Sequence, residues 1–185
     1  QDVGISIMAQ TEEICPADLK IYALRDVTGT VASLPLICGS IMSKKIAEGI
    51  QGLVLDIKVG NGTFMKSLSK AKGLGALLKE VGELYGINVS TSFTDMNQPL
   101  GNTAGLWCEI VESIECLKGN GPDDVMSVVY HLGEKALKIS GCNNPEEQLR
   151  TAISDGSAMD KFMHMISAHG GLLDSLIDSK THQPK

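Results

Sequence analysis

Arg25, Ser40 and Lys44 are the residues whose types and spacing could do chemistry in this chain. Ile37, Ser40 and Lys44 follow one another at steps of three and four residues, which places side chains along one stripe of a helix. That stripe carries an apolar contact, a hydroxyl and a cation, and Arg25 with Asp26 lies on the approach to it. The combination could hold a small polar ligand, although spacing alone is explained more simply by a solvated lysine on an exposed helix.

A helix from Pro35 to about Glu48 has to position this stripe. Ser33 is a suitable N-cap, and proline suits the first turn of a helix because its missing N–H is not needed there. Gly49 ends the helix, and a shorter helix over 16–24 precedes it. The sequence therefore predicts a helical pair within residues 16–49.

Strand and helix patterns alternate around this pair. Strands are expected over 3–8, 53–59 and 87–93, and helices over 69–85, 103–117, 122–139, 145–154 and 157–168, before a polar tail after Asp178. Parallel strands joined by crossover helices predict an α/β fold with a helix-rich C-terminal third. The helical pair interrupts that pattern, so we expect residues 1–15 and 50–185 in an α/β lobe and residues 16–49 in a helical lobe.

Composition excludes some classes of function. The 185 residues are 43% apolar and 21% charged, with a net charge of -6, which argues against binding to nucleic acid. No apolar run is long enough to cross a bilayer, and five cysteines without a CxxC pair are typical of reduced thiols. We expect a cytoplasmic protein that acts on a small molecule. The start at Gln1 without a methionine suggests an internal piece of a longer protein.

Five segments, in order along the chain, resemble the thymidine and pyrimidine-nucleoside phosphorylases. They are PADLKIYALRDVTGTV at 16–31, SIMSKK at 40–45, LDIKVGNGTFM at 55–65, TDMNQPLG at 94–101 and LKGNGP at 117–122. Several long motifs in the family's order are a far more specific signal than any single short pattern. The resemblance is strong over the first two thirds of the chain and looser over the last.

The resemblance implies reversible phosphorolysis, in which inorganic phosphate attacks C1′ of a pyrimidine nucleoside and releases the base and a pentose 1-phosphate. It implies that Arg25, Ser40 and Lys44 grip the pyrimidine's carbonyl and imide edge, where fixed positive groups stabilise the departing base. Phosphate is then a co-substrate, and no organic cofactor is needed. The positions that match the lining of the base pocket are Tyr22, Val31, Ile37 and Phe64.

The resemblance also implies features outside the base pocket. Some family members hold a cation, here a potassium or calcium ion, through positions that match the backbone carbonyls of Leu100 and Thr103 and the carboxylate of Glu112. Family members pair as homodimers through their helical domains. The family's glycine-rich phosphate loop and its C-terminal extension have no match here, so no phosphate-binding residues are expected in this chain. The 185 residues alone should then lack phosphorolytic activity.

Three alternatives stay open. One is a related phosphorylase that acts on nucleoside monophosphates, which extra cations for the 5′-phosphate would distinguish. A second is a phosphoribosyltransferase of the same structural superfamily, such as the anthranilate-using type, and the set of Arg25, Ser40 and Lys44 argues against it. The third is a non-catalytic binding module on the same fold, which the absent phosphate loop keeps open.

Overall fold

The computed structural model describes residues 3–9, 11 and 13–173, which fold into an α/β arrangement, as predicted. Its elements are α1 (Pro16–Val27), α2 (Leu34–Ala47), β1 (Gly52–Val59), α3 (Leu68–Leu84), β2 (Asn88–Asp95), α4 (Leu106–Leu117), α5 (Asp123–Ile139), α6 (Pro145–Ser154) and α7 (Ser157–Ala168). The chain divides into two compact units. One comprises residues 9–98 and 135–142, and the other the remaining described residues.

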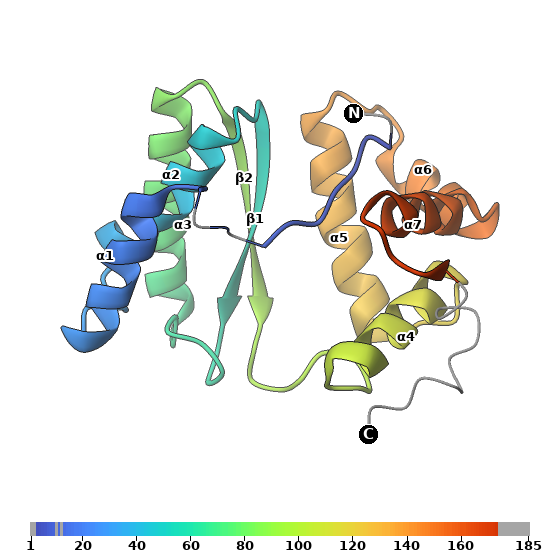
Figure 1. The fold of residues 1–185 in the computed structure, drawn as a ribbon, viewed down its shortest axis with the longest axis horizontal. Coiled ribbons are helices and arrows are strands. Elements are labelled where there is room, and N and C mark those ends of the chain that lie inside the picture. The colour runs from blue at the N-terminus through green and yellow to red at the C-terminus, as the bar shows by residue number, and fades with distance from the viewer. Residues whose placement is uncertain (1–2, 10, 12, 174–185) are drawn as a thin grey trace. The chain divides into compact units, whose positions relative to one another are not determined.

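A parallel two-stranded sheet lies at the centre of the first unit. β1 and β2 pair from Gly52 opposite Asn88 to Val59 opposite Asp95, and α3 is the crossover between them. A parallel pair requires such a crossover, which the sequence predicted. In Figure 1, α1, α2 and α3 of this unit lie on the same side of the two strands.

The core of this unit forms where α2 and α3 pack above the sheet. Met42 of α2 and Leu78 of α3 are the largest fully buried side chains among the described residues. Gly82 lets α3 approach β2 closely, because a Cβ at this position would collide with the side chain of Val89. Packing of this kind fixes α2 relative to β1, and both elements border the candidate site. The buried residues of the core are Cys38, Met42, Ile57, Met65, Ala71, Leu74, Leu78, Ile87 and Val89.

Local sequence sets the limits of α2 nearly as predicted. Ser33 occupies the N-cap position and Pro35 the first turn, but the Ser33 hydroxyl makes no capping hydrogen bond. The Ser33 carbonyl accepts the first helical bond, from the amide of Ile37 at 2.9 Å. Gly49 follows the C-cap with a φ of 68°, a left-handed conformation that glycine adopts without strain.

The second unit is helical, which confirms the helix-rich C-terminal third. α4, α6, α7 and the first part of α5 belong to it, while residues 135–142, which comprise the end of α5 and the turn after it, belong to the unit with the sheet. Its buried apolar residues are Ile114, Cys116 and Met165. Neither unit contains another strand among the described residues.

Three local predictions were wrong. The segment 3–8 forms no strand, and Ile7 is 71% exposed there, because its apolar pattern has no neighbouring strand to pair with. The helix expected from Thr103 begins at Leu106, since Gly105 has a φ of 137° that a helix does not accommodate. α1 runs three residues beyond its expected end. The polar tail after Asp178 lies outside the described residues, and the division into α/β and helical lobes stays a prediction.

Candidate functional site

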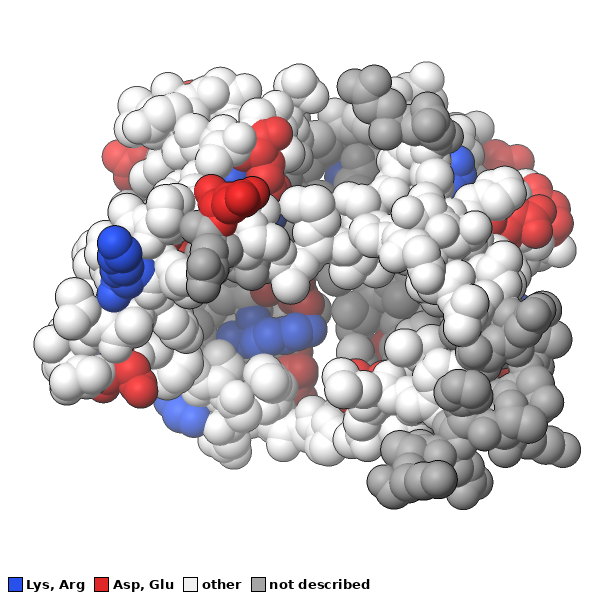
Figure 2. Space-filling model, viewed as in Figure 1, with Lys and Arg blue, Asp and Glu red and all other residues white. Residues whose placement is uncertain are grey.

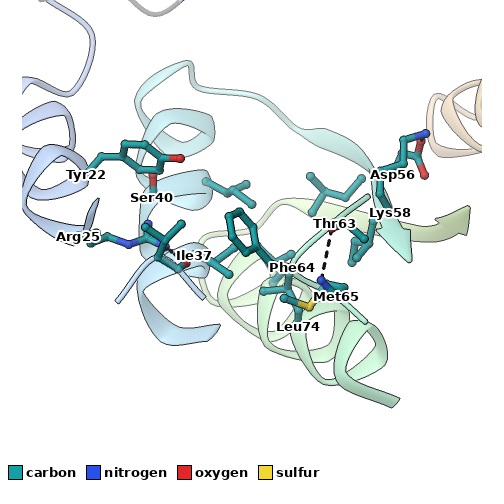
Figure 3. A pocket seen from close by; sticks show the side chains of 15 residues that line it. Tyr22, Arg25, Ile37, Ser40, Asp56, Lys58, Thr63, Phe64, Met65 and Leu74 are labelled. Atoms are coloured by element: carbon teal, nitrogen blue, oxygen red, sulfur yellow. Dashed lines mark hydrogen bonds and ion pairs between the residues drawn. The ribbon is translucent and has the colours of Figure 1, made fainter. Parts of the chain in front are cut away.

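A cavity of about 350 Å³ in the first unit is bordered by α1, α2, β1, α3 and the loop after β1. Figure 3 shows the aromatic ring of Phe64 between residues of the two N-terminal helices and those of the strand. The volume suits a small organic molecule. Six of the residues predicted for a base site line this cavity: Tyr22, Arg25, Val31, Ile37, Ser40 and Phe64.

Arg25 is the most deeply buried cation of the site, with 3% of its surface exposed. Its guanidinium donates to the carbonyl of Leu36 at 3.2 Å and to the carbonyl of Val31, and it lies 5.2 Å from the ring centroid of Tyr22. These contacts hold the plane of the guanidinium in one orientation. Its Nε is buried without a hydrogen-bond partner among the described residues. A buried donor without a partner costs free energy, and an acceptor on a ligand would recover this cost once the neighbouring side chains move to admit it.

Lys44 lies one helical turn beyond Ser40 and does not itself line the cavity. Its ammonium donates to the Ser40 hydroxyl at 3.1 Å and to the Asp18 carboxylate at 2.5 Å. The hydroxyl of Ser40 therefore links the cation to the cavity. The structure brings Arg25, Ser40 and Lys44 into one neighbourhood, although Lys44 reaches it only through Ser40.

Asp18 belongs to this neighbourhood and was missed in the sequence. Its burial would raise the pKa of the carboxyl, but hydrogen bonds from Lys44 and Ser40, with the charges of Lys44 and Arg25, hold that pKa below its usual value. The carboxylate is therefore ionised at neutral pH. Asp18, Tyr22 and Arg25 follow one another at steps of four and three along α1, a spacing that would have placed Asp18 on the same stripe.

Aromatic and aliphatic side chains form the walls of the cavity. Tyr22 is 50% exposed and Phe64 60% exposed, so both rings are open to a planar ligand. β1 and α3 supply further apolar contacts through Leu55, Ile57 and Leu74, and none of these three residues was predicted. A flat apolar wall beside a buried guanidinium and a hydroxyl can hold a planar heterocycle by its polar edge.

A second polar group borders the same cavity at β1. Lys58 donates to Thr94 at 3.0 Å and pairs with Asp56 at 2.5 Å, and the Thr94 hydroxyl donates to Asp56 at 2.6 Å. Asp56 and Lys58 share one face of the strand, and Thr94 is the partner of Lys58 in the sheet. The group was missed because the pairing partner of β1 cannot be read from its own sequence. We refer to Asp56, Lys58 and Thr94 as the strand cluster.

The residues predicted to hold a cation lie in the other unit. Glu112 accepts a hydrogen bond from the amide of Asn102 at 2.8 Å, and the Thr103 hydroxyl is buried without a partner among the described residues. Thr103 and Glu112 line a separate cavity of about 750 Å³, which Leu100 does not line. The described residues contain no group of three or more His, Cys, Asp or Glu side chains suited to a metal. The backbone carbonyls expected as ligands at Leu100 and Thr103 do not belong to such a group of side chains, and the cation stays a prediction.

The remaining features of the described surface are ordinary. On the face drawn in Figure 2, acidic and basic side chains are scattered among neutral ones. All five cysteines are free, and burial raises the pKa of the Cys38 and Cys116 thiols. Within the described part of the chain, no helix is both long and apolar enough to span a membrane.

Comparison with known proteins identifies the family. Residues 1–159 match the sequence model of the glycosyl transferase family, a/b domain, which is most of the chain. The chain belongs to this family. The match includes α1, α2, both strands and all the residues of the candidate site.

Relatives in this family confirm the resemblance of the sequence to pyrimidine-nucleoside phosphorylases. The chain is 45% identical over 183 residues to a thymidine phosphorylase of Mycobacterium tuberculosis, covering 98% of this chain and 42% of that protein. It is 43% identical over 187 residues to a pyrimidine-nucleoside phosphorylase of Staphylococcus epidermidis, covering 99% of this chain and 43% of the relative. The chain thus spans about two fifths of the length of these curated relatives.

Proposed function

We propose that the protein containing this chain catalyses the reversible phosphorolysis of pyrimidine nucleosides, and that this chain supplies the base-binding half of the site. One observation carries the proposal: a buried guanidinium with a free Nε and a hydroxyl linked to a lysine lie beside an open aromatic wall in one cavity. The names of the relatives give the reaction and the substrate class.

In this reaction, inorganic phosphate forms a bond to C1′ of the pentose while the bond from C1′ to the base nitrogen breaks. The electron pair of that bond moves into the base, which leaves with developing negative charge on its ring. Arg25 and the Ser40–Lys44 pair would donate to the carbonyl oxygens of the ring, where this charge accumulates. Such donors contribute to catalysis because their contacts strengthen as the bond breaks.

Partners and assembly follow as further parts of the proposal. A pyrimidine nucleoside and phosphate are the ligands, the phosphate is bound by residues outside this chain, and the protein works as a cytoplasmic homodimer that pairs through its helical segment. Exposed apolar side chains on α1 support such pairing, since Leu24 is 63% exposed and Val27 86% exposed. A cation at Leu100, Thr103 and Glu112 would belong to the other unit.

The test is phosphate-dependent release of base from thymidine, uridine and deoxyuridine by the full-length protein. Lys44→Ala should lower kcat/KM by about 100- to 1,000-fold, the range for loss of one donor to a developing anion. Lys45→Ala is the matched control, because the neighbouring Lys45 pairs with Glu48 on the exposed surface at 2.9 Å. Near-normal activity of Lys44→Ala would contradict the assignment of the base site, and an inactive wild-type protein would contradict the reaction.

A further inference from the structure

We infer that Asp18 is the positioning residue of this site: its carboxylate holds the Lys44 ammonium against Ser40 and balances one of the two positive charges at the helical side of the site. The inference rests on the proposed function. It extends that proposal because it gives an acidic residue a role beside the cations that are proposed to bind the base.

The contacts of Asp18 join two helices. Asp18 lies in the first turn of α1, and Lys44 lies in the last turn of α2, 26 residues further along the chain. Asp18 is only 8% exposed, and its Oδ2 is 2.5 Å from the lysine ammonium. An acid in the first turn of a helix commonly serves only the helix dipole, and such an acid is solvated. Burial and a partner on another helix indicate a different role for this one.

Geometry explains how Asp18 would act on the ligand. The lysine ammonium has three donors and lies at the end of a flexible four-carbon chain, so it needs a fixed partner to point in one direction. One donor of Lys44 is directed to Asp18 and another to Ser40 at 3.1 Å, on the side of the cavity. Without Asp18, the side chain could turn toward solvent, because 22% of its surface is already exposed.

Charge gives Asp18 a second effect. Arg25 and Lys44 carry two positive charges at neutral pH, and the carboxylate of Asp18 reduces the total at the site to one. A pyrimidine that leaves with its bonding electrons carries one negative charge. A site of net charge +1 therefore matches the departing base without binding anions in general, such as phosphate, as strongly as two uncompensated cations would.

The experiment is a double-mutant cycle in the full-length protein, with kcat and KM measured for thymidine phosphorolysis. Asp18→Asn keeps the size of the side chain and should lower kcat by about tenfold to a hundredfold with less change in KM, since misplacement of a catalytic group has effects of that order. The double variant Asp18→Asn/Lys44→Ala should be no slower than Lys44→Ala alone. Single effects that multiply in the double variant would overturn the inference, because Asp18 would then act independently of Lys44.

Glu48→Gln is the matched control. It removes the carboxylate partner of Lys45, the lysine next in sequence, but that pair is exposed and lies within one helix. Its kcat should equal that of the wild-type protein. If Asp18→Asn also left kcat unchanged while the wild-type protein was active, the inference would fail and the proposed function would stand.

A second readout does not depend on activity. Reductive methylation by formaldehyde and borohydride, with mass-spectrometric mapping, compares the labelling rates of Lys44 and Lys45 in the same sample. Asp18→Asn should raise the ratio of Lys44 to Lys45 labelling severalfold, and Glu48→Gln should lower it. Were the wild-type protein inactive toward pyrimidine nucleosides, the proposed function would fail and this ratio would still test the position of Lys44. An unchanged ratio in Asp18→Asn would overturn the inference.

Discussion

The cavity has two polar ends that differ in how completely their hydrogen bonds are satisfied. At the helical end, formed by Asp18, Arg25, Ser40 and Lys44, the Nε of Arg25 has no partner among the described residues. At the strand cluster, by contrast, Lys58, Asp56 and Thr94 bond to one another in a closed triangle. Side chains that already satisfy one another's hydrogen bonds gain little free energy from a ligand, whereas a buried donor without a partner gains much. The comparison supports the proposal that the helical end of the cavity is the half that binds the base.

Replacing the arginine of the helical end by lysine, and the lysine of the strand cluster by arginine, tests this difference most strongly. Arg25→Lys should lower kcat/KM about a hundredfold, equivalent to ~2.7 kcal/mol, because one ammonium cannot satisfy two backbone carbonyls and also offer a fixed Nε donor. Lys58→Arg should change kcat/KM less than about threefold, since its contacts do not depend on a fork of donors. Steady-state kinetics of thymidine phosphorolysis measures both. Equal losses in the two variants would remove the distinction between the ends.

The pH dependence of stability tests the helical end without any substrate. The pKa of Asp18 is lowered below its ordinary value of 3.8 in the folded chain, so its contribution to stability is complete above pH 3.8 and is lost as the pH falls through the lowered pKa. Asp18→Asn should therefore destabilise the protein by about 1–3 kcal/mol at pH 6. This difference from the wild-type protein should shrink as the pH falls below 3.8.

Urea unfolding at pH 6, 4.5, 3.5 and 3 gives the free energy of unfolding of both proteins. Glu48→Gln controls for the loss of a carboxylate as such, because its pair with Lys45 is exposed. A difference between Asp18→Asn and the wild-type protein that stays constant down to pH 3 would show that the Asp18 carboxylate is not stabilised by its partners.

Close packing of α3 on β2 shapes the unit that contains both ends of the cavity, and a pair of glycines on α3 tests this packing. Gly82→Ala should destabilise the protein by about 1–3 kcal/mol, because the new methyl group would collide with Val89. Gly73→Ala on the same helix meets only Leu34, at 3.9 Å, and should stabilise it by about 0.5–1 kcal/mol through higher helix propensity. Thermal unfolding compares the two variants, and a tolerated Gly82→Ala would contradict the close approach of α3 to the sheet.

The sequence predicted the helical end better than the strand cluster, and the reason is the range of the interactions. Arg25, Ser40 and Lys44 lie on helices whose stripes have a period that can be read locally. The strand cluster depends on the register of β1 with β2, which places Lys58 opposite Thr94 across 36 residues. Only the paired strands show that these side chains meet.

Asp18 was missed for a different reason. It lies inside a motif that was recognised, but its position in the first turn of α1 offered a local explanation, that of an acid at a helix N-terminus. Its partner on α2 appears only when the two helices pack. The strand predicted over 3–8 is absent for the opposite reason. Its local apolar pattern is typical of a strand, yet the described residues supply no strand to pair with it.

The smallest expected effect belongs to Lys58→Met. The side chain of Lys58 is 38% exposed, and Asp56 keeps the hydrogen bond from Thr94 when the cation is removed. The free energy of unfolding should therefore fall by less than about 1 kcal/mol, and kcat/KM should change less than about threefold. Urea unfolding and thymidine kinetics on one preparation measure both quantities. A large loss of kcat/KM with unchanged stability would mean that Lys58 leaves its triangle to bind substrate, and the cavity would then have two binding ends, with the strand cluster facing the pentose or the phosphate.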